Sequence, residues 1–337
     1  MCCLVAALTV TASSVCSCQA RQARFAAIGE LMKDGVIQTP SELYTKVLPN
    51  GSTLLVAAAE RGDEALVRRL LVAGVDPDGR AYKGNSVPLT RTQSAAVVRA
   101  LLQYGADENA VDAAGMTPLG WMASLDNMEG VRVLLAAGAK VNPGRRAMPP
   151  LLSAGSLGVA AQLIAAGADI DGVSPSGMTP LMKASSRGEV TLAELYLGAG
   201  AQVNAVDGAG NTALHVARSV PMVELLAKNG ADVRALNARG ESALFEIMHS
   251  AEMVRALVAA GVPMDVVSAE RKMTALQVML ADDRESDDAI LTLIAAGADV
   301  RGRTPEGYTT VQQASARSTG RRWAIIHALM RAGAQAE

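Results

Sequence analysis

Residues 117–138 read TPLGWMASLDNMEGVRVLLAAG. The Thr117 side chain can accept hydrogen bonds from the free backbone N–H groups at a helix start, and Pro118 has the backbone angle of a first helical turn. A second apolar run ends in Leu134 and Leu135, and Gly138 just after it can adopt the left-handed conformation that ends a helix. The stretch therefore predicts a short helix, a turn and a second helix.

The same two phrases recur along most of the chain. The opening phrase returns as Thr179-Pro180-Leu181, Thr212-Ala213-Leu214-His215 and Thr274-Ala275-Leu276. The closing glycine returns every 29 to 36 residues, at Gly74, Gly105, Gly138, Gly167, Gly200, Gly230, Gly261, Gly297 and Gly333. A helix pair of this length cannot bury an apolar face alone, so successive pairs have to stack into a common core.

This pattern resembles the ankyrin repeat, which has a period near 33 residues and the opening phrase T-P-L-H-x-A. The resemblance implies an all-α solenoid of about nine helix-turn-helix units, with connecting loops and β-turn fingers, over residues 52–337. It also implies a binding scaffold rather than an enzyme. The units are expected at about 52–84, 85–114, 115–146, 147–176, 177–209, 210–239, 240–272, 273–306 and 307–337.

The units differ in length in a regular way. The first-helix leucine precedes the closing glycine by 19 residues in the units of Leu55, Leu119 and Leu181, but by 16 in those of Leu89, Leu151 and Leu214. Three residues are close to one helical turn, so first helices of alternating length are expected. In the last units the spacing grows to 21 and 22 residues, and we interpret the extra acidic stretch at 282–288 as a projecting, solvated turn.

The chain before the repeats has a different composition. Residues 2–20 carry no charge, and Leu4 to Val15 have the apolar or small character of a secretory signal core. We therefore expect a signal peptide or lipoprotein signal at 1–20 and a helical N-terminal cap at 21–51 made of two short helices. Val15-Cys16-Ser17-Cys18 resembles a bacterial lipobox, which implies lipid attachment at Cys18.

Export predicts a periplasmic or envelope-associated protein, with a lipidated N-terminus as its one means of membrane attachment. The alternative is a cytoplasmic protein whose N-terminal cysteines have no role. All four cysteines lie within the first 18 residues, which excludes a disulfide framework or a cysteine zinc site in the repeats. With 31 basic and 33 acidic residues the chain also lacks the positive charge that favours nucleic acid as a partner.

The sequence offers little for catalysis. His215 occupies the histidine position of the ankyrin phrase, where the resemblance implies a local hydrogen bond that holds the turn. His249 and His327 have no second ligand at metal-binding spacing, so neither a metal nor another cofactor is expected. A hydrolase or transferase with an unrecognised site is the rival class, and its required nucleophile and base are not evident.

The ankyrin resemblance also places the binding surface. It implies that the residue two positions after the opening leucine faces a concave groove, which gives the inner row Ala57, Arg91, Trp121, Ser153, Lys183, Val216, Glu246, Val278 and Gln313. Loop tips should flank that groove with Met116, Met178, Asn211, Arg239, Glu241, Glu306 and Tyr308. Trp121 either anchors a partner or packs on an adjacent helix, and the sequence leaves both open.

We therefore predict a monomeric scaffold that binds a protein partner of unknown identity through the groove and the loop tips. An inhibitor or immunity-type protein, directed against a toxic enzyme of the cell envelope, is the alternative within the same class.

Overall fold

The computed structural model describes residues 12–48, 52–80, 86–144, 146–246, 250–318 and 320–335. The chain divides into two compact segments, Met1–Asp169 and Ile170–Glu337, which are described separately. Regular structure in the described residues is helical, with isolated antiparallel bridges such as Val267 to Thr274 in the loops. The expected all-α helix-turn-helix repeat is confirmed.

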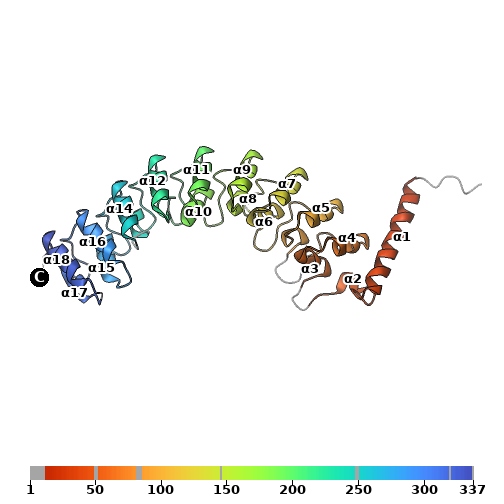
Figure 1. Ribbon diagram of the computed structural model, residues 1–337, viewed down its shortest axis with the longest axis horizontal. Coiled ribbons are helices and arrows are strands. Elements are labelled where there is room, and N and C mark those ends of the chain that lie inside the picture. Colours follow the sequence, from red (N-terminus) through yellow and green to blue (C-terminus); the bar gives the residue numbers. More distant parts are fainter. Residues whose placement is uncertain are drawn as a thin grey trace, which may run out of the picture. The chain divides into compact units, whose positions relative to one another are not determined.

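The first segment stacks its repeats in two helical layers (Figure 1). The inner layer contains α3 (Leu54–Arg61), the 3₁₀ turn η1 (Pro88–Thr90), α6 (Pro118–Ser124) and α8 (Pro150–Ser153), each packed on the next. The outer layer contains α4 (Glu64–Val72), α5 (Ala95–Gln103), α7 (Met128–Ala136) and α9 (Leu157–Ala165). Each unit therefore supplies one inner and one outer element.

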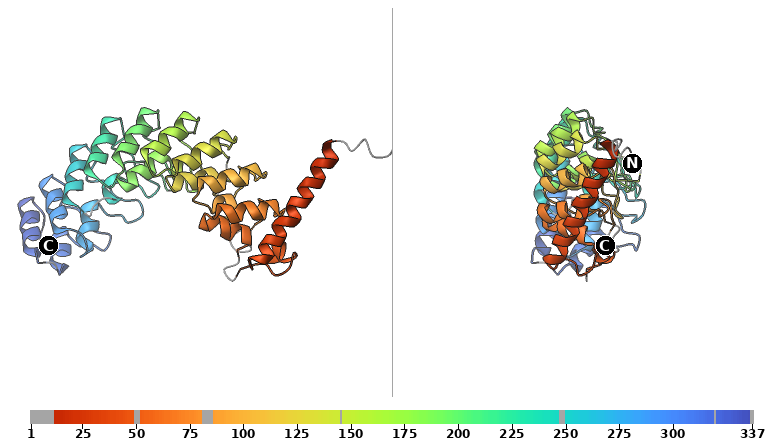
Figure 2. Two further views of the ribbon diagram at one scale, coloured as in Figure 1. Left: turned by 45° about the vertical axis from the view of Figure 1, so that its right-hand side comes forward. Right: turned by 90° about the vertical axis from the view of Figure 1, so that its right-hand side faces the viewer.

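Two further helices, α1 (Ala12–Lys33) and α2 (Glu42–Thr45), precede the repeats of the first segment (Figure 2). Helix α1 packs against α4, where Arg24 Nε donates to the Ala73 carbonyl oxygen at 2.9 Å and Arg69 Nη2 lies 2.7 Å from Asp34 Oδ2. It is longer than the short helix expected from the sequence. Residues 1–11, and the side chain of Cys18, lie outside what the structure describes, so the boundary at residue 20 stays a prediction.

The second segment repeats the two layers. Its inner helices are α10 (Pro180–Arg187), α13 (Ala243–Glu246), α15 (Ala275–Ala281) and α17 (Thr310–Ala316). Its outer helices are α11 (Val190–Gly198), α12 (Val220–Lys228), α14 (Ala251–Ala259), α16 (Asp287–Ala295) and α18 (Arg322–Arg331), and each packs on the next.

The alternation of inner-helix length is confirmed. Helices α3, α6 and α10 have 8, 7 and 8 residues, whereas η1 and α8 have 3 and 4. In the unit of Leu214, residues 213–216 form turns and no α-helix. In the units whose leucine-to-glycine spacing is three residues shorter, the inner element is therefore shorter by about one helical turn, while the outer helix keeps its length.

Local signals set the helix ends. All nine closing glycines have φ between +83° and +97°, a region that side chains with a Cβ avoid. Thr117 accepts from Gly120 N at 3.1 Å, as its capping role predicts. Of the two leucines that end the second apolar run, Leu134 is fully buried but Leu135 is only half-buried, so Leu135 is not the core residue that the leucine pair leads one to expect.

Polar contacts fasten each unit to the next. Backbone bonds join successive β-turn fingers, as in Met148 N to Gly115 O at 2.8 Å and Ala238 N to Ala209 O at 2.9 Å. In the loops after the outer helices, Asn109 Oδ1 accepts from Lys140 N at 2.7 Å. These bonds satisfy backbone groups that short helices leave without partners.

Candidate functional site

In the first segment, the inner-row side chains contact the preceding repeat. Arg91 is exposed, and its Nε lies 2.9 Å from Glu60 Oε1 on α3. Trp121 is half-buried, and its indole Nε1 donates to the Thr92 carbonyl oxygen at 2.7 Å. A hydrogen bond therefore fixes the Trp121 ring to the neighbouring repeat, whether or not its remaining surface also contacts a partner.

The other two inner-row residues of this segment, Ala57 and Ser153, are buried. Ser153 Oγ lies 3.9 Å from the sulfur of the loop-tip residue Met116. In this segment, much of the predicted inner row therefore makes contacts within the protein.

The row continues in the second segment. Lys183 and Val216 are half-buried, as is the loop-tip residue Met178. Partial burial lowers the pKa of the Lys183 ammonium, and nearby Arg187 lowers it further through charge repulsion.

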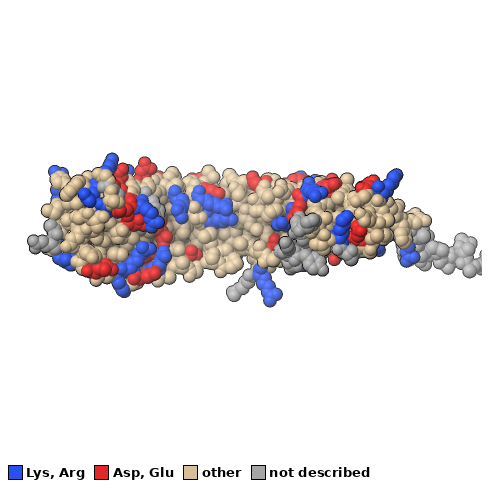
Figure 3. All heavy atoms as spheres, turned by 90° about the horizontal axis from the view of Figure 1, so that it is seen from below, with Lys and Arg blue, Asp and Glu red and all other residues tan. Residues whose placement is uncertain are grey.

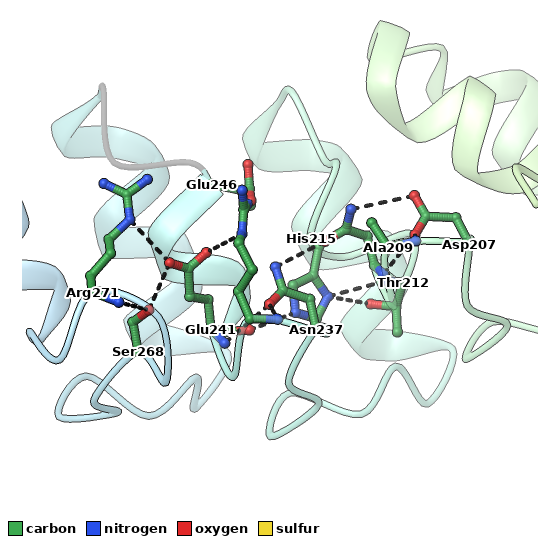
Figure 4. A network of polar contacts seen from close by, with 11 residues as sticks. Asp207, Ala209, Thr212, His215, Asn237, Glu241, Glu246, Ser268 and Arg271 are labelled. Atoms are coloured by element: carbon green, nitrogen blue, oxygen red, sulfur yellow. Dashed lines mark hydrogen bonds and ion pairs between the residues drawn. The ribbon is translucent and has the colours of Figure 1, made fainter. Parts of the chain in front are cut away.

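A polar network connects the fingers of the second segment (Figure 4). His215 Nδ1 lies 2.9 Å from Thr212 Oγ1, and its Nε2 lies 3.2 Å from the Glu241 carbonyl oxygen in the next unit. Burial lowers the pKa of the His215 imidazole, which favours the neutral ring. The expected local role of His215 is confirmed, and the ring also joins two repeats.

Asn211 belongs to the same network. Asp207 Oδ1 accepts from the backbone nitrogens of Ala209 and Asn211, each at 2.8 Å, and closes the finger turn. Asn211 Oδ1 then accepts from Asn237 Nδ2 at 3.1 Å. This loop-tip side chain therefore already has partners in its own and in the next finger.

Glu241 corrects the sequence prediction. It was expected at an exposed loop tip, yet its side chain is only 1% exposed. Its carboxylate lies 2.9 Å from Arg239 Nε and 3.2 Å from Arg271 Nε, and it accepts from Ser268 Oγ at 3.0 Å. Arg239 also pairs with Glu246 at the end of α13. A buried carboxylate thus holds two exposed guanidinium groups, that of Arg239 on its own finger and that of Arg271 on the next, and both neutralise its charge.

Two neighbouring depressions lie over the last inner helices. One, of about 650 Å3, is lined by Phe245 and Glu246 of α13, by Val278 of α15 and by Arg271. The other, of about 660 Å3, lies between α15 and α17 and is lined by Gln313, Ala316, Glu306 and Tyr308 among others. Met273 and Ala281 line both. We call the two together the terminal groove.

The terminal groove brings predicted residues together. Inner-row positions Glu246, Val278 and Gln313 line it from three successive units, and the loop tips Glu306 and Tyr308 line its edge. Lys and Arg side chains lie beside Asp and Glu side chains on this part of the second segment (Figure 3). Arg271 and Met273, which also line it, were missed, although Met273 holds the position before the opening threonine that Met116 and Met178 hold in their units.

The acidic turn beside the groove is not simply solvated. The Arg317 side chain is 1% exposed and donates to the carbonyl oxygens of Met279, Asp282 and Glu285 at 2.8, 2.7 and 3.0 Å. It also lies 3.1 Å from Asp287 Oδ1. A residue some 35 positions later in the chain therefore fastens the backbone of this loop, while the side chains of Asp283, Arg284 and Asp288 are exposed to solvent as expected.

Among the residues that the structure describes, no three His, Cys, Asp or Glu side chains are grouped as a metal site would require. The helices within the described ranges are also too short or too polar to cross a membrane.

A family model described as ankyrin repeats (3 copies) matches residues 54–145 and 151–237. The chain belongs to the ankyrin-repeat family. Ankyrin-repeat domains generally mediate protein–protein interactions, and ankyrin-repeat proteins are typically non-enzymatic binding scaffolds.

Solved structures agree with this fold. The ankyrin repeat domain of human ASB11 is 28% identical, with a TM-score of 0.57, and the match covers 62% of this chain and 98% of that one. The ankyrin repeat domain of Bcl-3, a member of the IkappaB protein family, is also 28% identical, with a TM-score of 0.50 and coverage of 62% and 99%. A search of the curated proteins found none with significant similarity.

Proposed function

We propose that this ankyrin-repeat protein binds a protein partner through its inner row and finger tips and catalyses no reaction. The observation that carries the proposal is the terminal groove, where inner-row residues of three successive units and exposed finger residues line two neighbouring depressions. Its two parts, at about 650 and 660 Å3, have the size of pockets that hold a few side chains each.

The residues of the proposed binding surface differ in how much of their side chain is exposed to a partner. Tyr308 is 57% exposed, which leaves a large aromatic surface for a partner. Inner-row residues Arg91, Trp121, Ser153, Lys183 and Val216, and finger residues Met116, Met178, Asn211 and Arg239, complete the proposed surface. Of these, Trp121 and Arg91 would have to serve the stack and the partner together.

Site-specific photo-crosslinking tests the proposal. A benzophenone amino acid placed at Gln313 or Tyr308 should capture one discrete partner band from the native source. The same group at Glu224, exposed on the outer helix α12, is the matched control. Equal capture from Glu224, or turnover of a substrate that a single point mutation abolishes, would contradict a scaffold that uses its inner face.

A separate proposal concerns location. The uncharged residues 2–20 support export, and processing at Cys18 would leave Arg24 and Asp34, which fasten α1 to α4, in the mature protein. An exported scaffold would meet its partner in the cell envelope. There it would act as the inhibitor or immunity-type protein for a toxic enzyme. Mass spectrometry of the N-terminus from fractionated cells tests this: full-length protein in the cytosol with Met1 intact would reject export.

A further inference from the structure

We propose that the pocket between α15 and α17 takes a partner segment carrying an apolar side chain next to a lysine or arginine. This rests on the proposed function and names the chemistry of the partner. Met273, Ala281 and Ala316 line the pocket with apolar atoms, and Tyr308 adds a ring that is 57% exposed. An apolar side chain of the partner would lose its contact with water there, which favours binding.

The charges around this pocket favour a cation. Its charged lining residues are Asp283, Glu306 and Arg317. The Arg317 charge is already engaged by Asp287 and by three carbonyl oxygens, so it does not offset the other two. Hydrogen bonds from the Ser318 hydroxyl and backbone N–H lower the pKa of Asp283, so its carboxylate stays charged at neutral pH.

The apolar walls and the acidic rim point to one kind of occupant. A partner segment would place its apolar side chain against Ala281 and Ala316, and its basic side chain near Glu306. An acidic segment would meet two carboxylates instead and be repelled.

Peptide selection on the intact chain tests the inference. A phage-displayed random dodecapeptide library panned against the protein should enrich sequences with Lys or Arg within two residues of Leu, Ile, Met or Phe. For a synthetic selected peptide, Asp283→Asn with Glu306→Gln should weaken binding about threefold to tenfold at low salt, because exposed charge pairs contribute modestly. Higher salt should reduce that difference.

Two matched controls separate the pocket from general effects. Ala316→Trp should fill the pocket and abolish binding, whereas Ala259→Trp, exposed on outer helix α14, should not. Glu224→Gln on α12 controls for the loss of an acidic group. Thermal melts of each variant show that the fold is retained.

The outcomes distinguish this inference from the proposed function. Selected peptides that are acidic or neutral, yet lose binding with Ala316→Trp, would overturn the inferred chemistry and leave the groove as the binding site. If the selection enriches no peptide whose binding is lost with Ala316→Trp, the pocket is not a binding site. Crosslinking from Tyr308 would then report independently on whether the inner face binds a partner.

Discussion

The inner row is used differently in two parts of the molecule. In the repeats of η1 and α6, Arg91 and Trp121 reach back to Glu60 and to the Thr92 carbonyl oxygen. In the repeats of α15 and α17, the equivalent residues Val278 and Gln313 line the terminal groove, but Val278 is buried and Gln313 Nε2 donates to the Gln277 carbonyl oxygen of the preceding repeat at 3.1 Å. The row therefore takes part in the stack in both regions and in the second also lines a depression, so a row of such positions is not by itself a binding site.

Loop length accounts for part of the difference. The turn between α15 and α16, residues 282–286, is longer than those between α3 and α4, α6 and α7, and α10 and α11, and Arg317 donates to two of its carbonyl oxygens. The added chain makes a wall for the groove.

The largest expected effect comes from removing that support. Arg317→Met should destabilise the protein by about 3 to 5 kcal/mol, because it leaves the partly buried Asp287 carboxylate and several buried or partly buried carbonyl oxygens without their partner. Urea unfolding measures the loss. Arg331→Met, exposed on α18, should change stability by less than about 0.5 kcal/mol. A similar loss for both variants would show that Arg317 does not support the groove wall.

The core shared by all repeats should respond next. Leu134→Ala removes a fully buried side chain of α7 and should cost about 2 to 5 kcal/mol. Leu135→Ala, at the half-buried neighbouring position, should cost clearly less. Thermal melting of the pair tests the corrected assignment of the core, and equal losses would restore Leu135 to it.

The closed part of the inner row gives a smaller effect. Trp121→Phe keeps the aromatic ring but removes the hydrogen bond to the Thr92 carbonyl oxygen, at a cost of about 0.5 to 1.5 kcal/mol. Trp323→Phe, at a ring 71% exposed, is the control. Unchanged stability of Trp121→Phe would mean that Trp121 is free for a partner, as the groove interpretation of the sequence requires.

The smallest effect concerns pH. Burial lowers the pKa of His215 below its usual 6.5, so the unfolded chain binds a proton more readily than the folded one. Stability from this residue is therefore complete above about pH 6.5 and declines as the pH falls from there through the lowered pKa of the folded state. His215→Gln should flatten that part of the profile of unfolding free energy against pH. His327→Gln, exposed on α18, should retain it.

Much of the fold could be predicted because its signals are local. A threonine caps a helix through an N–H three residues away, as Thr117 does with Gly120, and a closing glycine such as Gly138 sets its own φ. The spacing from leucine to glycine determines how many residues remain for the inner helix. Turn contacts such as that of Thr212 with His215 follow the same logic.

The candidate site depended on contacts that no local pattern contains. Glu241 is buried because Arg271, 30 residues later, reaches it, and Arg317 supports a loop whose Asp282 lies 35 residues earlier. Whether Trp121 faces a partner depends on a carbonyl oxygen in the preceding repeat. The sequence alone determined the repeat, its helix ends and the row of inner positions, because each depends on residues that lie close together in the chain. Only the tertiary structure decided which of those positions stay open, because that depends on how far side chains reach between stacked units.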